Sequence, residues 1–125
     1  MSREVDLWLE DILESGRLVS GWTRGLTSAE FRADRRTVDA VLRNLEVIGE
    51  AVKHLPEDLR SREPSVPWRR IAGLRDVLAH AYFAVDLDLV WDVVAHHLEP
   101  LLEAASRLRG EEGGDGRRRG RLDSG

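Results

Sequence analysis

With 125 residues, the chain has room for one domain built around one hydrophobic core. Its 42% hydrophobic and 34% charged residues are typical of a soluble globular protein. No apolar run approaches the roughly 18–20 residues that span a bilayer. The absence of cysteine excludes disulfides and thiolate chemistry. A net charge of −4 restricts any contact with nucleic acid to a local patch, and the lack of a secretory segment leads us to expect a cytoplasmic protein.

The N-terminal part of the chain predicts one long helix and one short helix. Apolar residues repeat with helical spacing over residues 3–20, so an amphipathic helix is expected there. Gly21 and Gly25 then bracket a predicted turn. Thr27 and Glu30 have the spacing of a capping box, in which each side chain accepts a hydrogen bond from the other residue's backbone N–H. A short helix should therefore begin at this point.

The strongest helical pattern lies between Asp34, a candidate N-cap, and Pro56, which cannot continue the helix. Gly49 interrupts this helix at a cost of about 1 kcal/mol relative to alanine. On a buried face, the missing side chain would let a neighbouring helix approach closely. A connector follows, with one helical turn expected at 57–62. The predicted core face consists of Val38, Val41, Leu42, Leu45, Ile48, Val52 and Leu55.

Two more helices are predicted in the second half of the chain. One begins at Trp68 and buries Ile71, Leu74 and Leu78, and a longer one is capped by Asp86. Because Pro100 lies inside the longer helix, we expect a kink near the adjacent His96 and His97. The predicted core positions of this helix are Leu87, Val90, Val94, Leu98, Leu101, Ala105 and Leu108.

The composition changes abruptly after Leu108. Residues 1–109 are predicted to form the helical domain, and residues 110–125 a disordered tail rich in glycine and arginine. Four main helices joined by short connections predict an all-α antiparallel bundle with additional short helices. The tail contains a basic cluster that could contact RNA, although a solvated tail is the simpler interpretation: Arg117, Arg118, Arg119 and Arg121.

The residues that are best suited to form a catalytic or binding site are Arg75, His80 and Tyr82. On a continuous helix, Arg75 and Tyr82 share a face, whereas His80 lies about 140° from Arg75. His80 can join the other two only if the helix unwinds near Ala81 or if a second subunit completes the site. A purely structural interpretation is also open, in which Arg75 pairs with an acid, His80 fills a helix end and Tyr82 buries its ring.

Motifs for other chemistry are weak or missing. The sequence contains no phosphate-binding loop, no dinucleotide-binding glycine motif and no zinc-protease motif. Asp92 and His96 have the i,i+4 spacing of a metal-ligand pair, but two ligands alone make a weak case. We therefore predict neither a metal nor a cofactor.

Four sequence features recur together in a known family: the RxxxxHxY signature at Arg75, His80 and Tyr82, and the blocks LWLEDILESG (7–16), RNLEVIGEAVKHLP (43–56) and VPWRRIAGLRDVLAHAYFAVDLDLVWDVV (66–94). In these features the sequence resembles the HepT-like family within the HEPN superfamily. The resemblance covers about residues 3–109. Asp76 departs from the pattern, since relatives commonly carry asparagine after the arginine.

The resemblance implies a HEPN-like helical bundle that forms a homodimer, with the Arg–His pairs of the two subunits facing each other. It also implies a metal-independent endoribonuclease that acts as the toxin of a type VII-like toxin–antitoxin system. The partner would be a minimal, MntA-like nucleotidyltransferase antitoxin that neutralises the toxin by transferring AMP to the motif tyrosine. Carried over to this chain, Arg75 and His80 are catalytic and Tyr82 is the modification site.

The chemistry of these residues fits RNA cleavage without a metal. The imidazole of a histidine ordinarily has a pKa of about 6.5, which suits His80 as a general base or acid at neutral pH. The planar guanidinium group of Arg75 has N–H donors whose geometry matches the oxygens of a phosphate. Two copies of His80 in a dimer could serve as base and acid in the same step. Further candidate RNA contacts are Arg69, Arg70 and Asp76, with Arg43 nearby through packing, although a solvated helix face explains the first two equally well.

Two other functions keep the same fold. In the first, the chain is a non-catalytic helical binding partner of a nucleotidyltransferase. In the second, the roles are reversed and this chain acts as an antitoxin or accessory protein to the transferase. The RNA target cannot be read from the sequence in any of these cases.

Overall fold

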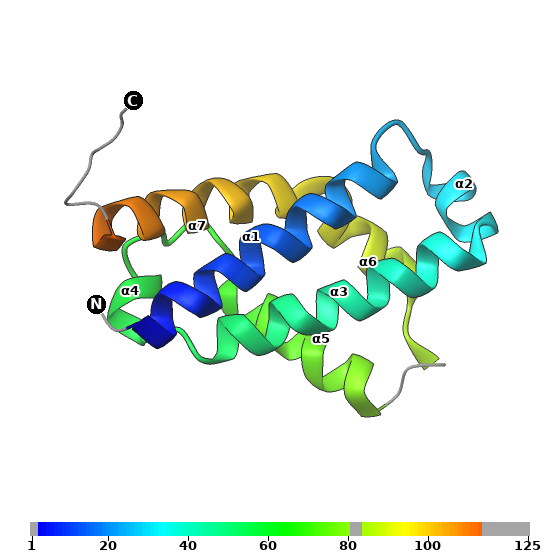
Figure 1. The fold of residues 1–125 in the computed structure, drawn as a ribbon. Coiled ribbons are helices and arrows are strands. Elements are labelled where there is room, and N and C mark those ends of the chain that lie inside the picture. The colour runs from blue at the N-terminus through cyan, green and yellow to red at the C-terminus, as the bar shows by residue number, and fades with distance from the viewer. Residues whose placement is uncertain (1–2, 81–83, 114–125) are drawn as a thin grey trace.

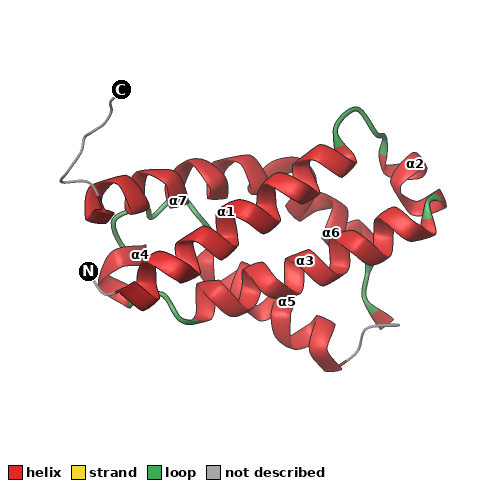
Figure 2. Ribbon diagram, in the orientation of Figure 1, coloured by secondary structure: helices red, strands yellow, loops and turns green. Residues whose placement is uncertain are grey.

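The structure, a computed structural model, describes residues 3–80 and 84–113, and every regular element within these ranges is helical (Figure 1, Figure 2). The elements are α1 (Arg3–Thr23), α2 (Ser28–Ala33), α3 (Arg35–Lys53), α4 (Glu57–Arg60), α5 (Trp68–His80), α6 (Leu87–Asp92), the π-helical turn η2 (Val93–His97) and α7 (Leu98–Gly113). The all-α prediction is therefore confirmed.

The long helices form an antiparallel bundle in which α3 is central. Helix α3 packs against α1 on one side and α5 on the other, and α1 also packs against α7. Each neighbour in this series runs opposite to the previous one, and the short helix α4 lies at the end of the bundle where α1 begins (Figure 1). The motif helix α5 is thus held mainly by α3, so the position of its side chains depends on that one interface.

The predicted helix caps are present. Thr27 and Glu30 form a reciprocal capping box at the start of α2. The side chain of Asp34 accepts a hydrogen bond from the backbone N–H of Thr37 at the start of α3, and hydrogen bonds from Thr37 hold the pKa of Asp34 below its usual value. Asp86 caps α6 through the backbone N–H of Asp88. Caps of this kind typically contribute about 1 kcal/mol each, which explains why these helices begin where they do.

The turn after α1 differs from the prediction. Gly21 lies inside α1, which continues to Thr23, and only Gly25 belongs to the turn. Gly25 has a φ of 81°, in the left-handed region that favours glycine. Gly21 has open space where a Cβ would be, so nothing in the described part of the chain requires a glycine there.

The bundle core confirms the predicted apolar faces. All seven predicted core residues between Val38 and Leu55 are buried, and so are those of α5. In the last helical segment Leu87 is only partly buried, while the other six predicted positions are buried. The largest fully buried side chains are Phe31, Leu9, Ile12, Ile48, Leu59, Leu78, Leu101 and Leu108.

The last long helix contains a π-helical turn where a kink was predicted. Residues Val93–His97 form η2, and α7 begins at Leu98. Pro100 has no N–H, so it cannot donate the usual hydrogen bond to the carbonyl of His96. In the π-helical turn just before Pro100, the backbone hydrogen bonds join residues five apart instead of four. Helix α7 runs to Gly113, past the predicted end of the helical pattern. The arginine cluster of the tail lies outside the described residues.

None of the described helices combines the length and the apolar composition that crossing a bilayer requires.

Candidate active site

Arg75 lies on α5 at the edge of the face that packs against α3. The buried residues Ile71, Leu74 and Leu78 form this face at intervals of three and four residues. Arg75 follows Leu74 directly, and its side chain is 30% exposed. The guanidinium is therefore held against the bundle while solvent, and hence a phosphate, can still reach it.

Gly49 on α3 allows α5 to approach this closely. A Cβ placed on Gly49 would lie 2.6 Å from the Cβ of Arg75 and 3.1 Å from the carbonyl oxygen of Ile71. Real Cβ atoms essentially never come within 3.0 Å of such a neighbour. The prediction that Gly49 permits close helix packing is confirmed, and the helix it admits is the one that carries the motif.

An ion pair between α3 and α5 fixes the direction of the Arg75 side chain. The Nε of Arg75 lies 2.9 Å from Oε1 of Glu50, and its Nη1 lies 3.6 Å from Oδ1 of Asp76. A charge-assisted contact of this length is stronger than a neutral hydrogen bond. An acidic partner for Arg75 was one of the interpretations open from the sequence, but the sequence did not identify that partner as Glu50.

Asp76 is the centre of a second contact between the same helices. Lys53 on α3 donates a hydrogen bond of 3.0 Å to Oδ1 of Asp76. This bond, with smaller contributions from the charges of Arg75 and His80, holds the pKa of the Asp76 carboxyl below its usual value. An ionised carboxylate repels phosphate, so any contact of Asp76 with RNA would be to a hydroxyl group or a base rather than to the backbone.

His80 is the last residue of α5 and is exposed. Its Nδ1 lies 2.9 Å from the backbone carbonyl oxygen of Asp76. A carbonyl can only accept a hydrogen bond, so this bond requires the proton on Nδ1. In the neutral ring Nε2 is then the nitrogen that can accept a proton from a substrate, and the helix end holds the ring in that orientation.

Within one chain, the structure does not join the two candidate catalytic groups. Arg75 contacts α3, whereas His80 bonds back to its own helix, and no hydrogen bond or ion pair connects them in the described part of the chain. Tyr82, the predicted modification site, lies outside the described residues, as does Ala81, near which the helix would have to unwind in one of the two alternatives left open by the sequence.

The other predicted RNA contacts lie elsewhere on α5. Arg69 is exposed and lines a hollow between α4 and the start of α5. Arg70 donates a hydrogen bond of 2.7 Å to Oδ2 of Asp92, and Nε2 of His97 lies 3.5 Å from the same oxygen. The charge of Arg70 is thus partly compensated, which weakens its attraction for phosphate.

The structure pairs Asp92 with a different histidine from the one that its sequence spacing suggested. The sequence spacing paired Asp92 with His96, but His96 is exposed and His97 makes the contact. The cause is the π-helical turn, which brings residues five apart together instead of four. Among the described residues, no three His, Asp or Glu side chains gather as a metal site requires.

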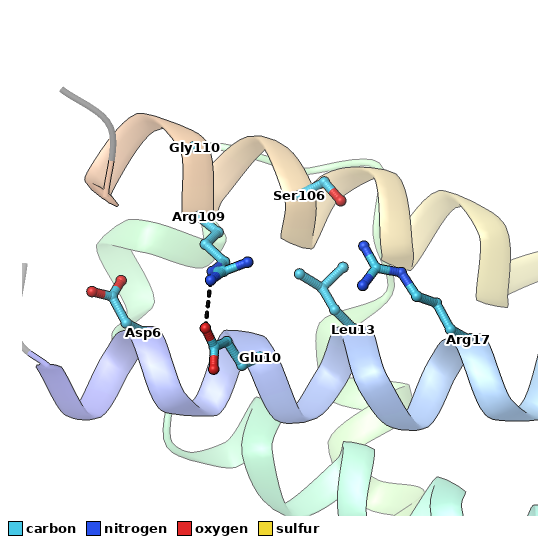
Figure 3. A pocket seen from close by; sticks show the side chains of 7 residues that line it. All are labelled: Asp6, Glu10, Leu13, Arg17, Ser106, Arg109 and Gly110. Atoms are coloured by element: carbon cyan, nitrogen blue, oxygen red, sulfur yellow. Dashed lines mark hydrogen bonds and ion pairs between the residues drawn. The ribbon is translucent and has the colours of Figure 1, made fainter. Parts of the chain in front are cut away.

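One large hollow is remote from these residues. It measures about 580 Å³, lies between α1 and α7, and is crossed by the ion pair of Arg109 with Glu10 (Figure 3). A smaller pocket of about 220 Å³ lies directly beside Arg75. Its other lining residues belong to α1 and α3, and none of them except Arg43 was a predicted site residue: Trp8, Asp11, Arg43, Glu46, Val47 and Glu50.

Comparisons with known proteins identify the class of protein. The sequence model of the family described as "Ribonuclease HepT-like" matches residues 12–108, which include every element from α2 to η2, parts of α1 and α7, and both Arg75 and His80. No solved structure is similar enough to count as a match. Together with the fold, the match defines an all-helical ribonuclease.

Similar proteins are found in several organisms. The chain is 41% identical over 114 residues to MJ0127 of Methanocaldococcus jannaschii, which carries a provisional RNase name, covering 88% of this chain and 94% of the relative. It is 40% identical over 109 residues to the "Probable ribonuclease HepT" of Thermococcus cleftensis, covering 87% and 99%. A protein of Caldanaerobacter subterraneus, also provisionally named an RNase, is 34% identical over 105 residues, covering 84% and 94%. The chain belongs to the HepT-like ribonuclease family.

Proposed function

We propose that this chain is the toxin of a toxin–antitoxin pair and cleaves RNA without a metal ion, using Arg75 and His80. The observation that carries the proposal is the exposure and orientation of these two side chains on α5. Arg75 is fixed by Glu50 yet reachable, and His80 stands exposed at the helix end with Nε2 directed away from its backbone bond. These two groups supply the charge stabilisation and the proton transfer that cleavage at a 2′-hydroxyl requires.

The reaction would begin when Nε2 of a neutral His80 accepts the proton of a 2′-hydroxyl. The 2′-oxygen attacks the adjacent phosphorus, and the bond from phosphorus to the 5′-oxygen breaks. A protonated second copy of His80 gives its proton to the departing oxygen, while Arg75 stabilises the charge on the phosphoryl oxygens. The products are a 2′,3′-cyclic phosphate and a 5′-hydroxyl, and the need for one neutral and one protonated imidazole gives a bell-shaped pH profile.

A homodimer would supply the second imidazole, and the outer face of α5 supports one. Val77 is 43% exposed, and the neighbouring Gly73 is exposed with open space where a Cβ would lie. A glycine inside an exposed helix costs about 1 kcal/mol, so its presence is explained if a second copy of α5 packs closely there. Val77 lies three residues, less than one turn, before His80.

Introducing a charge at Val77 tests the dimer. The Val77→Glu variant should sediment as a monomer and lose RNA cleavage, because it places a carboxylate in the proposed interface. Leu18→Glu is the matched control, since Leu18 is equally exposed at 44% but lies on α1. The proposal predicts that this control stays dimeric and active. A wild-type chain that sediments as a monomer while cleaving RNA would contradict the shared site.

The cleavage itself is tested with two strands of identical sequence, one RNA and one DNA, in the presence of EDTA. The RNA should be cut and the DNA left intact, because DNA has no 2′-hydroxyl to attack. Cleavage of the DNA strand, or loss of RNA cleavage in EDTA, would exclude the proposed mechanism.

We also propose that a nucleotidyltransferase antitoxin silences the chain by transferring AMP to Tyr82. The added phosphate would bring negative charge and bulk two residues from His80 in the sequence, and would therefore compete with the RNA phosphate. Mass spectrometry of the chain purified together with such a partner should find AMP on Tyr82. A Tyr82 that is consistently unmodified in the inactive complex would rule out this form of regulation.

A further inference from the structure

The pocket beside Arg75 lies where α1, α3 and α5 meet, and its volume is about 220 Å³. This is smaller than the roughly 300–1,000 Å³ of pockets that hold drug-sized ligands, so it suits one planar group rather than a whole nucleotide. We infer that it binds a single RNA base next to the cleaved bond, and that guanine is the base it fits best. The inference rests on the proposed function, because Arg75 is the group that links the pocket to the phosphate.

The charges around the pocket argue against a phosphate inside it. Three carboxylates, from Asp11, Glu46 and Glu50, face two guanidinium groups, from Arg43 and Arg75. Arg75 is already paired with Glu50. A negatively charged group would therefore be repelled, while a neutral group that can both donate and accept hydrogen bonds would be favoured.

Three of these side chains are available to a ligand. In the described part of the chain, the side chains of Asp11, Glu46 and Arg43 make no hydrogen bond or ion pair. Asp11 lies on α1, and Glu46 and Arg43 lie on α3 one turn from each other. The pocket thus offers two carboxylates that can accept hydrogen bonds and one guanidinium group that can donate them.

Trp8 supplies an aromatic wall that is held in place. Its ring stacks on the imidazole of His54, with ring centroids 4.3 Å apart and an angle of 15° between the planes. Trp8 is partly buried and lines the pocket, so little side-chain freedom is lost when a base binds beside it. Proteins that read single-stranded RNA commonly combine an aromatic surface with hydrogen bonds to the edges of the base.

Guanine matches this set of groups better than the other bases. Its O6 and N7 accept the two parallel hydrogen bonds of an arginine, the role open to Arg43. Its N1–H and amino group are adjacent donors that one carboxylate can accept together, the role open to Glu46, one turn from Arg43 on the same helix. Adenine and cytosine offer only part of this pattern, and uracil has no amino group.

Cleavage and binding tests with the full chain examine this inference. RNA strands of uridines that differ only in one central base should be cut about 10–100-fold faster, in kcat/KM, when that base is guanine rather than uracil. Fully 2′-O-methylated strands of the same sequences cannot be cleaved through the 2′-oxygen. Their binding, measured by fluorescence anisotropy, should show the same preference for guanine.

Two variants connect the preference to the pocket. Glu46→Gln and Arg43→Met should each reduce the ratio of guanine to uracil towards one in both assays. Glu103→Gln, at an exposed position of α7, is the control that should keep the ratio.

Equal binding of the guanine and uracil strands by the wild-type chain would overturn the inference, as would a preference that survives in both variants. Because binding is measured on strands that cannot react, it also separates the two proposals. Guanine-dependent binding without cleavage of RNA would support the pocket and overturn the proposed function. Cleavage of RNA with no preference for guanine in either assay would support the proposed function and overturn the inference about the pocket.

Discussion

Replacing His80 with alanine should lower kcat/KM for RNA cleavage by about 10²–10⁴-fold, the usual contribution of a general acid–base group. In the proposed dimer the substitution removes the base and the acid together, so the upper part of this range is expected. His80 is exposed, and its only hydrogen bond in the described structure is to the carbonyl of Asp76 on its own helix. The fold should therefore remain intact, and the melting temperature measured alongside the kinetics should change little.

His96→Ala is the matched control for this experiment. His96 is also an exposed histidine, but it lies on η2, and its side chain makes no hydrogen bond, ion pair or ring contact in the described part of the chain. Its replacement should leave cleavage and growth inhibition at the wild-type level. If a strain expressing the His80→Ala chain is still inhibited, the toxicity does not come from cleavage, and a non-catalytic binding partner of a nucleotidyltransferase becomes the better description. Toxicity from the transferase alone would instead identify this chain as the antitoxin.

Replacing Gly49 with alanine should destabilise the fold and disturb the site together. The new Cβ would lie 2.6 Å from the Cβ of Arg75, so α3 and α5 must move apart. Overpacking of this kind typically costs about 1–3 kcal/mol in the free energy of unfolding. Urea unfolding should show this loss, and kcat/KM should fall as well, because the ion pair of Arg75 with Glu50 depends on the same interface.

Gly21→Ala separates the packing effect from the helix propensity of glycine. Gly21 lies inside α1 with no atom within 4 Å of the position where a Cβ would be. Alanine there should stabilise the chain by about 0.4–1 kcal/mol, since it is the better helix former. A Gly49→Ala chain that gains the same stability would show that α3 and α5 do not pack as described.

The helices could be predicted because their signals are local. Thr27 with Glu30, Asp34 and Asp86 act as caps wherever the rest of the chain lies, and the apolar spacing identified the buried faces. Gly49 could also be interpreted from the sequence, since a glycine on a buried helix face commonly marks the close approach of a second helix. The π-helical turn could not, because no residue pattern distinguishes it from an ordinary proline kink.

The candidate site could be predicted only in part. The motif identified Arg75 and His80, but the contacts that orient them depend on how α3 and α5 are aligned along each other. That alignment is set by packing of the whole interface, so the pairs of Arg75 with Glu50 and of Asp76 with Lys53 follow no local spacing. The pocket wall formed by Trp8 arises in the same way, from helices that are far apart in the sequence.

The 3′ ends of the RNA fragments test the central claim most directly. Purified chain should be incubated with a defined RNA strand in EDTA and the fragments analysed by mass spectrometry. Attack by a 2′-oxygen activated by His80 predicts a 2′,3′-cyclic phosphate on the upstream fragment and a 5′-hydroxyl on the downstream fragment. Fragments that end in a 3′-hydroxyl and begin with a 5′-phosphate would mean that water attacks the phosphorus, and the roles assigned to Arg75 and His80 would then be wrong.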